Sequence, residues 1–268
     1  MLRNLRTLPK ERQPLDLFVA RSLTFPSVTS ATSCAKGTKL TMPKSAAESV
    51  ESHARLSEGS SLPIIHAAVV EALRAVHSDG GTLVDVGCGS GSLWALVRSS
   101  FGRYVGLDLV KYPDFPADGE LIVANLDGNP PASLDECGDA VVSLETIEHL
   151  ENPRAFMQKL VRLAKPGALV IVTTPNQLSL LSKMTLVAKN QFNAFQERPG
   201  LYPAHITALL EIDLLRIAKE CGLIQPTIRY TNAGRIPFTP LNWPGWLGGR
   251  MFSDNVLLVT RKPLRMRS

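Results

Sequence analysis

The stretch Gly87–Gly91 has glycine at every second position and directly follows the apolar run Thr82–Val86. Glycines between a strand and a helix let the backbone turn sharply and let a ligand approach without a Cβ in the way. A plain tight turn can have the same composition, so the nearby carboxylates matter. Asp85 lies inside the apolar run, where a buried acid needs hydrogen-bond donors. Asp108 ends the next apolar run, where a carboxylate can accept both hydroxyls of a ribose. Together these residues predict a site for a ligand that carries a ribose.

A second group of reactive side chains follows the apolar run Asp139–Leu144. Glu145, Glu148 and His149 have the spacing i, i+3, i+4, which places them on one face if the segment is helical. With His205, two carboxylates and two imidazoles would suit a divalent metal. Alternatively, His149 is a general base that takes a proton from a hydroxyl, or Glu145 and His149 only fix the loop. The general base with Glu145 beside it is favoured, because a metal needs His205 brought across a long insertion.

Short apolar runs alternate with helical segments from Ser60 onwards, and no internal repeat is visible. Strand-helix alternation with continuously apolar strands predicts a parallel sheet covered on both faces. The expected strands are 82–86, 103–107, 120–124, 139–144, 168–173, 226–230 and 255–260, and the expected helices are 62–76, 91–100, 151–165 and 207–221.

The glycine stretch also resembles a known family. The sequences D-V-G-C-G-S-G at Asp85–Gly91 and G-L-D-L at Gly106–Leu109 are similar to the first two motifs of class I S-adenosylmethionine-dependent methyltransferases. A nicotinamide fingerprint differs, because its third glycine is Ser92 here. Val141–Leu150 and Leu163–Leu169 resemble the family's fourth strand with its exit loop and its run into the fifth strand. Over about residues 60–262, the chain resembles the type 11/23 methyltransferases and the ubiquinone-biosynthesis O-methyltransferases.

This resemblance implies a Rossmann-like α/β sheet of seven strands, the last antiparallel, with S-adenosylmethionine across the carboxyl ends. The methionyl group would meet Asp85 and the glycine loop, and Asp108 would bind the ribose. Asn125 stands where the family usually has an acid beside adenine. Similar E-x-x-E-H segments occur in the ubiquinone-biosynthesis enzymes and in small-RNA 2′-O-methyltransferases, where Glu, Glu, His and His hold a metal. The implied cofactor-binding residues are Asp85, Gly87, Cys88, Gly89, Gly91, Asp108, Leu109, Asn125, Leu126 and Ser143.

Two apolar segments lie outside these motifs. Residues 177–204 form an insertion after the fifth strand, where we expect either a lid over the acceptor pocket or extra core packing. The second segment, Ile236–Leu247, contains Trp243 and Trp246 and three prolines that forbid a regular helix or strand. It either wraps hydrophobic surface or meets an apolar partner. The two segments together predict an enclosed, apolar acceptor site or docking at a membrane surface.

Charge and composition limit the partners and the compartment. Residues 1–41 carry seven Lys and Arg against two Asp and Glu, whereas residues 42–260 have a net charge of −4. A nucleic-acid enzyme normally places positive charge on its folded surface, so RNA is disfavoured as a substrate. Four cysteines without a CxxC pair indicate a reducing compartment.

The basic, Ser/Thr-rich residues 1–59 are expected to be a flexible extension of a domain at 60–268. Residues 1–41 are also consistent with a transit peptide, or with a true start at Met42, and we expect a cytoplasmic protein.

The sequence therefore predicts a methyltransferase that moves the S-adenosylmethionine methyl group to a small or lipid-like acceptor, at oxygen. The alternatives are a metal-dependent RNA 2′-O-methyltransferase, a single-domain nicotinamide oxidoreductase and a non-catalytic cofactor-binding subunit. The sequence names neither the acceptor nor the oligomeric state.

Overall fold

The computed structural model describes residues 59, 61–74 and 80–265. The chain divides into two units, Met1–Thr41 and Met42–Ser268, and every strand and helix given below belongs to the second. The predictions of a transit peptide and of a start at Met42 lie outside the described residues, as does the flexible extension predicted at 1–59 except for Gly59.

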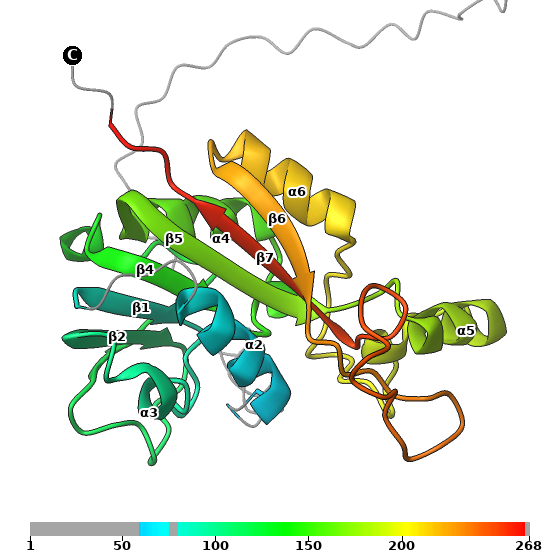
Figure 1. The fold of residues 1–268 in the computed structure, drawn as a ribbon. Helices are drawn as coiled ribbons and strands as arrows, with labels where there is room; N and C mark the ends of the chain where they lie inside the picture. Colours follow the sequence, from blue (N-terminus) through cyan, green and yellow to red (C-terminus); the bar gives the residue numbers. More distant parts are fainter. Residues whose placement is uncertain (1–58, 60, 75–79, 266–268) are drawn as a thin grey trace, which may run out of the picture. The chain divides into compact units, whose positions relative to one another are not determined.

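Seven strands form one mixed sheet in the order β3-β2-β1-β4-β5-β7-β6 (Figure 1). Neighbouring strands are parallel from β3 through β5, and β7 is antiparallel to both β5 and β6. This is the predicted Rossmann-like sheet with an antiparallel last strand. The strands are β1 (Thr82–Val86), β2 (Arg103–Asp108), β3 (Glu120–Val123), β4 (Gly138–Ser143), β5 (Ala164–Pro175), β6 (Ile224–Tyr230) and β7 (Asn255–Arg261).

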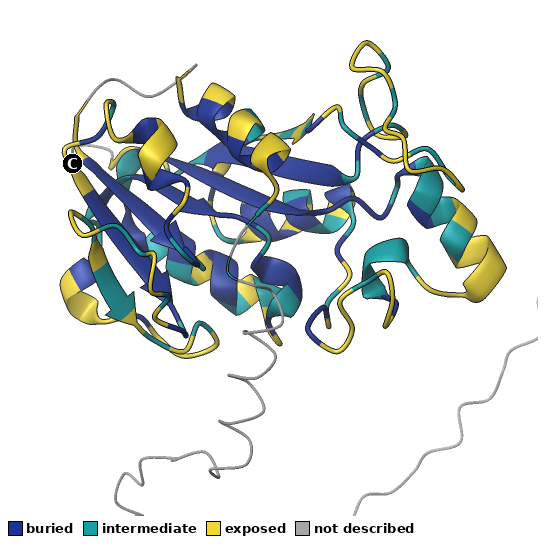
Figure 2. Ribbon diagram, turned by 90° about the horizontal axis from the view of Figure 1, so that it is seen from below, coloured by how far each residue is buried: buried dark blue, intermediate teal, exposed yellow. Residues whose placement is uncertain are grey.

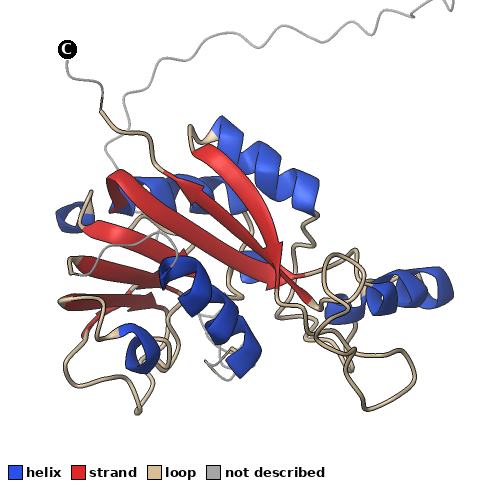
Figure 3. Cartoon of the chain, viewed as in Figure 1, coloured by secondary structure: helices blue, strands red, loops and turns tan. Residues whose placement is uncertain are grey.

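Helices cover both faces of the sheet, α2 and α3 on one side and α4 and α6 on the other (Figures 1 and 3). A further helix, α5, projects beyond the end of the sheet. The helices are α2 (Pro63–Arg74), α3 (Trp94–Val97), α4 (Pro153–Leu163), α5 (Leu180–Lys189) and α6 (Glu211–Glu220), with 3-10 turns η1 (Ala132–Leu134), η2 (Ile147–His149) and η3 (Asn193–Phe195).

The core consists of two layers, one on each face of the sheet. Alternate residues of a strand point to opposite faces, so Leu83 packs with the α2 and α3 side chains and Val84 with those of α4 and α6. All five residues of β1 are buried, as Figure 2 shows for the central strands. This burial on both faces explains why the strands are continuously apolar rather than alternating.

Three predicted helices are shorter in the structure. The helix predicted at 91–100 is regular only over Trp94–Val97, because its first residues close the glycine turn through a bond from Gly91 N–H to the Cys88 carbonyl. The helix predicted at 151–165 begins after Asn152, whose side chain accepts from Ala155 N–H at 3.0 Å. The helix predicted at 207–221 begins only at Glu211.

The segment between β6 and β7 has no regular helix or strand over Ile236–Leu247, as its prolines predict. A single bridge pairs Arg235 with Asn242 in this segment. Among the described residues, no helix has the length and apolar character needed to cross a membrane.

Candidate active site

A cavity of about 850 Å³ lies at the carboxyl ends of the central strands. Its wall includes the turn after β1, the ends of β2 and β4, and the residues that follow β3 and β5. The amino-terminal turn of α2 and the loop 199–206 also contribute. Ligands of open α/β sheets bind at this edge, where the strand order reverses between β1 and β4. The position therefore agrees with the sequence motifs.

The glycine turn is shaped by the protein's own packing. Gly87 and Gly89 have φ angles of 78° and 53°, which favour glycine. A Cβ on Gly87 would lie 2.1 Å from the Thr146 hydroxyl oxygen, and one on Gly89 would lie 2.0 Å from the Gly59 carbonyl oxygen. Contacts with the Thr146 side chain and with the Gly59 backbone already require glycine at these two positions, so a branched side chain at Gly89 would displace the loop even without a ligand.

Asp108 ties the glycine turn to the end of β2. One oxygen of its carboxylate accepts from Gly89 N–H at 2.8 Å and the other accepts from Val110 N–H at 3.0 Å. Burial raises the pKa of this carboxyl group, and the backbone donors oppose the rise. Asp108 lines the cavity. It can therefore hold the turn and present acceptor oxygens to a ligand.

Asp85 also lines the cavity and has one unsatisfied, buried oxygen. Its Oδ2 accepts from the Tyr104 hydroxyl at 2.9 Å, whereas Oδ1 has no hydrogen-bond partner among the described residues. Burial raises the pKa of Asp85 to about 7. Tyr104 is itself fixed by stacking on Trp94 and Phe115. A rigid, buried carboxylate with a free oxygen suits a cationic ligand group.

The remaining predicted cofactor residues divide into two groups. Cys88, Leu109, Asn125 and Leu126 line the cavity, as Asp85, Gly87, Gly89 and Asp108 do. Gly91 and Ser143 do not. A Cβ on Gly91 would meet Pro116 at 2.6 Å, so this glycine accommodates a neighbouring loop. Ser143 is fully buried in β4.

Glu145 follows β4, lines the cavity and has a strained backbone conformation. Its φ angle is 48°, so residues 145–149 are not the helical face that the i, i+3, i+4 spacing predicts. Its carboxylate accepts from Thr173 Oγ1 at 2.8 Å and from Asn255 Nδ2 at 2.6 Å. Burial raises the pKa of Glu145 to about 7, and these two bonds oppose the rise. Glu145 lines the cavity, but its carboxylate is not among the potential ligand atoms that gather at Glu148, His149 and His205 in the described part of the chain.

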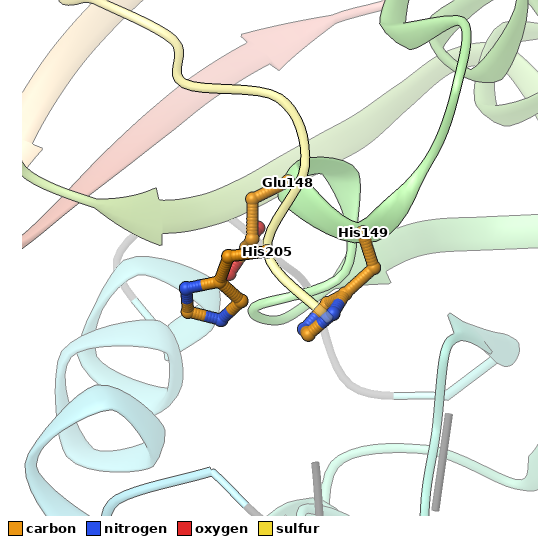
Figure 4. Close-up of side chains that lie close together, drawn as sticks. All are labelled: Glu148, His149 and His205. Carbon is orange, nitrogen blue, oxygen red and sulfur yellow. The ribbon is translucent and has the colours of Figure 1, made fainter. Parts of the chain in front are cut away.

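Glu148, His149 and His205 form a cluster (Figure 4). Each offers one potential ligand atom, and these atoms lie within 4.8 Å of one another. The two imidazole rings meet edge to face with centroids 4.7 Å apart. Glu148 Oε2 accepts from Thr174 Oγ1 at 3.1 Å, and its Oε1 has no hydrogen-bond partner among the described residues. The structure therefore brings His205 beside His149 across the long insertion, which the sequence alone did not determine.

Backbone hydrogen bonds bring His205 to this position. Ile206 N–H and Thr207 N–H both donate to the Glu148 carbonyl oxygen at 2.9 Å. Thr207 Oγ1 donates to the Leu150 carbonyl at 2.8 Å. These bonds hold residues 206–207 in an extended conformation against η2, which is why α6 starts four residues later than predicted.

The backbone also orients both imidazoles. His149 Nδ1 lies 3.0 Å from the Ala204 carbonyl oxygen and His205 Nδ1 lies 2.9 Å from the Ala194 carbonyl oxygen. A carbonyl can only accept, so each Nδ1 carries the proton and each Nε2 keeps a lone pair. Such a tautomer suits metal ligation, and it equally suits a base.

Electrostatics leave this cluster without a compensating cation. Burial raises the pKa of Glu148 well above its usual range, and the nearby Glu145 adds to the rise. Burial lowers the pKa of His149, and burial together with His149 lowers the pKa of His205 to about 4. In the described part of the chain, no Lys or Arg forms an ion pair with either glutamate. Buried acids beside neutral imidazoles form an environment that a divalent cation would stabilise.

The sequence pattern did not identify the side chains that hydrogen-bond to the predicted site residues. The available signal was a polar residue within an otherwise apolar strand, since a buried polar group needs a partner. His66, which lines the cavity from α2, lies on a helix that was assigned only to packing. The other missed residues are Tyr104, Thr173, Thr174 and Asn255.

Comparison with known proteins now adds to this geometry. Residues 64–223 match the family model of a methyltransferase domain. The chain belongs to the class I S-adenosylmethionine-dependent methyltransferases. S-adenosylmethionine is therefore the methyl donor, and the nicotinamide alternative loses its support.

Relatives and solved structures agree with the family. The mitochondrial ubiquinone biosynthesis O-methyltransferase of Dictyostelium discoideum is 32% identical over 120 residues, 38% of this methyltransferase and 37% of the relative. The ubiquinone biosynthesis O-methyltransferase of Leptothrix cholodnii is 25% identical over 197 residues, 69% and 79% of the two chains. A SAM-dependent methyltransferase of Thermotoga maritima shares the fold, with a TM-score of 0.53 and 13% identity over 81% of this chain and 95% of that chain.

Proposed function

We propose that this methyltransferase transfers the methyl group to an oxygen of a small or lipid-like hydroxylated acceptor, with a divalent metal held by Glu148, His149 and His205. The observation that carries the proposal is the cluster itself: His149 and His205 line the cavity, Glu148 is buried beside them, and the three offer potential ligand atoms within 4.8 Å of one another. The names of the relatives, O-methyltransferases of ubiquinone biosynthesis, support oxygen as the acceptor atom.

The part of the cavity lined by Asp85 and Asp108 would hold the cofactor. The unsatisfied oxygen of Asp85 suits the methionyl ammonium, and Asp108 suits the ribose hydroxyls. Asn125 and Leu126 would border adenine, where the Asn side chain can both donate and accept. In this placement the acceptor lies between the sulfonium and the histidine cluster.

The residues present fit a divalent ion. Imidazole and carboxylate together suit Zn²⁺, Mn²⁺ or Fe²⁺, and Glu145 lines the cavity beside them. Such an ion, when bound, would act as a Lewis acid and lower the pKa of an acceptor hydroxyl. The protein would then hold that oxygen in line with the methyl group and exclude water, and positioning of this kind supplies roughly 7–11 kcal/mol.

The second candidate mechanism uses His149 as a general base, because His149 lines the cavity and its Nε2 keeps a lone pair. The structure provides one observation against a role for Glu145 as its partner, since both oxygens of that carboxylate are occupied by Thr173 and Asn255. The net charge of −4 on residues 42–260 favours a small acceptor over RNA.

The test combines metal content with turnover. Purified full-length enzyme is assayed with labelled S-adenosylmethionine and catechol-type acceptors, with and without an apolar tail, beside a short RNA. We expect O-methylated phenol, loss of turnover with chelator and recovery with Zn²⁺ or Mn²⁺. His205→Ala should lose the bound metal but still bind S-adenosylhomocysteine. Glu211→Gln is the matched control, because Glu211 is a buried acid bonded to Arg250 and Tyr230, outside the cluster.

Three outcomes would contradict the proposal. Methylated nitrogen or carbon would refute transfer to oxygen, and methylated RNA in place of phenol would refute the small acceptor. Turnover that ignores chelator and rises with pH through the His149 pKa would replace the metal with a general base.

A further inference from the structure

Helix α5 exposes its apolar side chains and buries a polar one. Its only buried residue is Ser182, whereas Met184, Leu186 and Val187 are exposed, Val187 by 90%. A surface helix normally turns its apolar stripe toward the core, as α4 does. Nothing within the described chain covers this side of α5, which projects from the end of the sheet (Figures 1 and 2).

The segment between β6 and β7 exposes its apolar residues in the same way. Phe238 is 93% exposed and Trp246 is 81% exposed, and Leu241 and Met251 are exposed as well. We refer to residues 231–253 as the aromatic loop. Several large exposed apolar side chains gathered on one loop are typical of an interaction surface.

The base of the aromatic loop is well held, so this exposure is part of a fixed structure. Ile236 N–H donates to the Leu241 carbonyl at 2.8 Å, and Trp243 N–H donates to the Gly234 carbonyl at 2.8 Å. Trp243 packs edge to face on Phe252 with ring centroids 5.1 Å apart. Trp243 is therefore half-buried against Phe252, whereas Trp246 is exposed.

The two segments lie side by side beside the active-site cavity. Leu180 N–H, at the start of α5, donates to the Met251 carbonyl at 2.9 Å. Ser179 and Ser182 line the cavity from the α5 side, and Arg235 and Asn242 line it from the aromatic loop. The exposed apolar side chains therefore belong to the same elements that form the acceptor end of the cavity.

The charges of these segments are of one sign. Residues 177–196 and 231–253 contain two lysines and two arginines and no Asp or Glu, although residues 42–260 as a whole are acidic. Arg235 pairs with Asp254 and Arg250 with Glu211, just outside the segments. Lys183 and Lys189 of α5 have no ion pair in the described part of the chain.

We propose that α5 and the aromatic loop dock on the surface of a bilayer that contains anionic lipids. Separate apolar tips, with Trp and Phe at their ends and lysines beside them, fit an interface of acyl chains and negative headgroups. A second protein would instead need one continuous complementary surface. Docking in this orientation would place the cavity next to the membrane, where an acceptor with an apolar tail can enter. The docking itself does not depend on the proposed reaction.

The experiment measures binding of the full chain to vesicles of phosphatidylcholine, with and without phosphatidylglycerol. We expect sedimentation with the anionic vesicles, and a blue shift of tryptophan emission that Trp246→Phe abolishes, because Trp94 is buried and Trp243 is packed. The double variant Phe238→Ser, Trp246→Ser should lose roughly tenfold or more in partitioning. Lys183→Glu with Lys189→Glu should remove the preference for anionic lipid.

Leu96→Ser is the matched control, because Leu96 is an exposed apolar residue of α3, outside both segments. It should bind vesicles normally, and all variants should bind S-adenosylhomocysteine as a check of folding. Three results would overturn the proposal. The first is vesicle binding that persists in the double variant and disappears only with salt, which would assign it to the basic residues 1–41. The second is a concentration-dependent dimer that the double variant abolishes, which would assign the surface to a second copy of the chain. The third is no binding to either kind of vesicle.

Discussion

The cavity has a cofactor end around Asp85 and Asp108 and an acceptor end around Glu145, His149 and His205. The contacts that hold these two ends differ in how far apart their partners lie in the sequence. At the cofactor end, the contacts that fix Asp85 and Asp108 join residues 19 positions apart, Asp85 with Tyr104 and Gly89 with Asp108. At the acceptor end, His149 bonds a carbonyl 55 positions away, and Glu145 bonds Asn255, 110 positions away. The contacts that fix Asp85 and Asp108 thus lie within one β-α-β crossover, whereas those of the acceptor end join the residues after β4 to β5 and β7.

This difference has a chemical counterpart. The cofactor end is fixed mainly by backbone donors and close glycine packing, which leave few side chains free to vary. The acceptor end relies on hydrogen bonds made by side chains of Glu145, η2, β5, β7 and the loop after η3. We therefore expect substitutions at the acceptor end to lower turnover without changing cofactor affinity, and substitutions at the cofactor end to lower cofactor affinity.

The largest effect is expected for Glu148→Gln. The substitution keeps the shape and the Thr174 contact but replaces the carboxyl group beside the two histidines with a neutral amide. Turnover should fall by roughly 10²–10⁴-fold, as for loss of an essential acid-base or ligand group. The affinity for S-adenosylhomocysteine, measured by calorimetry, should remain at the wild-type value. A parallel loss of cofactor affinity would show that the two ends are not separable.

The next largest effect is expected at the cofactor end, for Asp108→Ala. This change removes the acceptors of Gly89 N–H and Val110 N–H together with the ribose contacts. Loss of about 1.5–3 kcal/mol should weaken S-adenosylhomocysteine roughly ten- to a hundredfold. The bound metal, measured by elemental analysis, should be unaffected. Asp108→Asn, which keeps one acceptor oxygen, should lie between wild type and Ala, and an unchanged Ala variant would refute the ribose assignment.

A pH dependence of cofactor binding should follow from Asp85. Burial raises its pKa to about 7 in the free protein, so the carboxylate is largely ionised at pH 8 and largely protonated at pH 6. Only the ionised form attracts the methionyl ammonium, so affinity should fall as pH falls, by about tenfold between pH 8 and pH 6. Asp85→Asn should bind weakly with no such slope. A flat profile in the wild type would show that the ammonium lies elsewhere.

The arrangement of the cofactor end could be predicted better than that of the acceptor end, because its contacts join residues that are close in sequence. A glycine turn between a strand and a helix is encoded within a few residues, so Gly87, Gly89 and Asp108 were identified together with their geometry. The spacing of Glu145, Glu148 and His149 indicated a helical face, but the positive φ of Glu145 depends on Thr173 and Asn255, which are distant in sequence. The approach of His205 depends on the Glu148 carbonyl, which no side-chain pattern records.

The smallest expected effect concerns a contact that links α4 to the adenine side of the cavity. Lys159 Nζ donates to the Leu126 carbonyl at 2.8 Å and to the Asp127 carbonyl at 2.7 Å, 33 and 32 residues away in sequence. Burial lowers the pKa of this ammonium, and Asp127 opposes the shift. These two bonds join residues farther apart in sequence than the bonds of Asp85 and Asp108 do. They therefore test whether the cofactor end depends only on contacts between residues close in sequence.

Lys159→Met keeps the apolar stem and removes both donors, and the freed carbonyls can turn toward water because Asp127 is exposed. S-adenosylhomocysteine should therefore bind only roughly two- to fivefold more weakly, in line with the modest net value of a solvated hydrogen bond. Calorimetry with adenosine should show the same factor, because the two Lys159 bonds hold only the loop beside adenine, whereas Asp85→Asn should leave adenosine binding unchanged. Lys159→Arg, which retains donors to the two carbonyls, is the control. A loss as large as that of Asp108→Ala would mean that the cofactor end, like the acceptor end, depends on contacts distant in sequence.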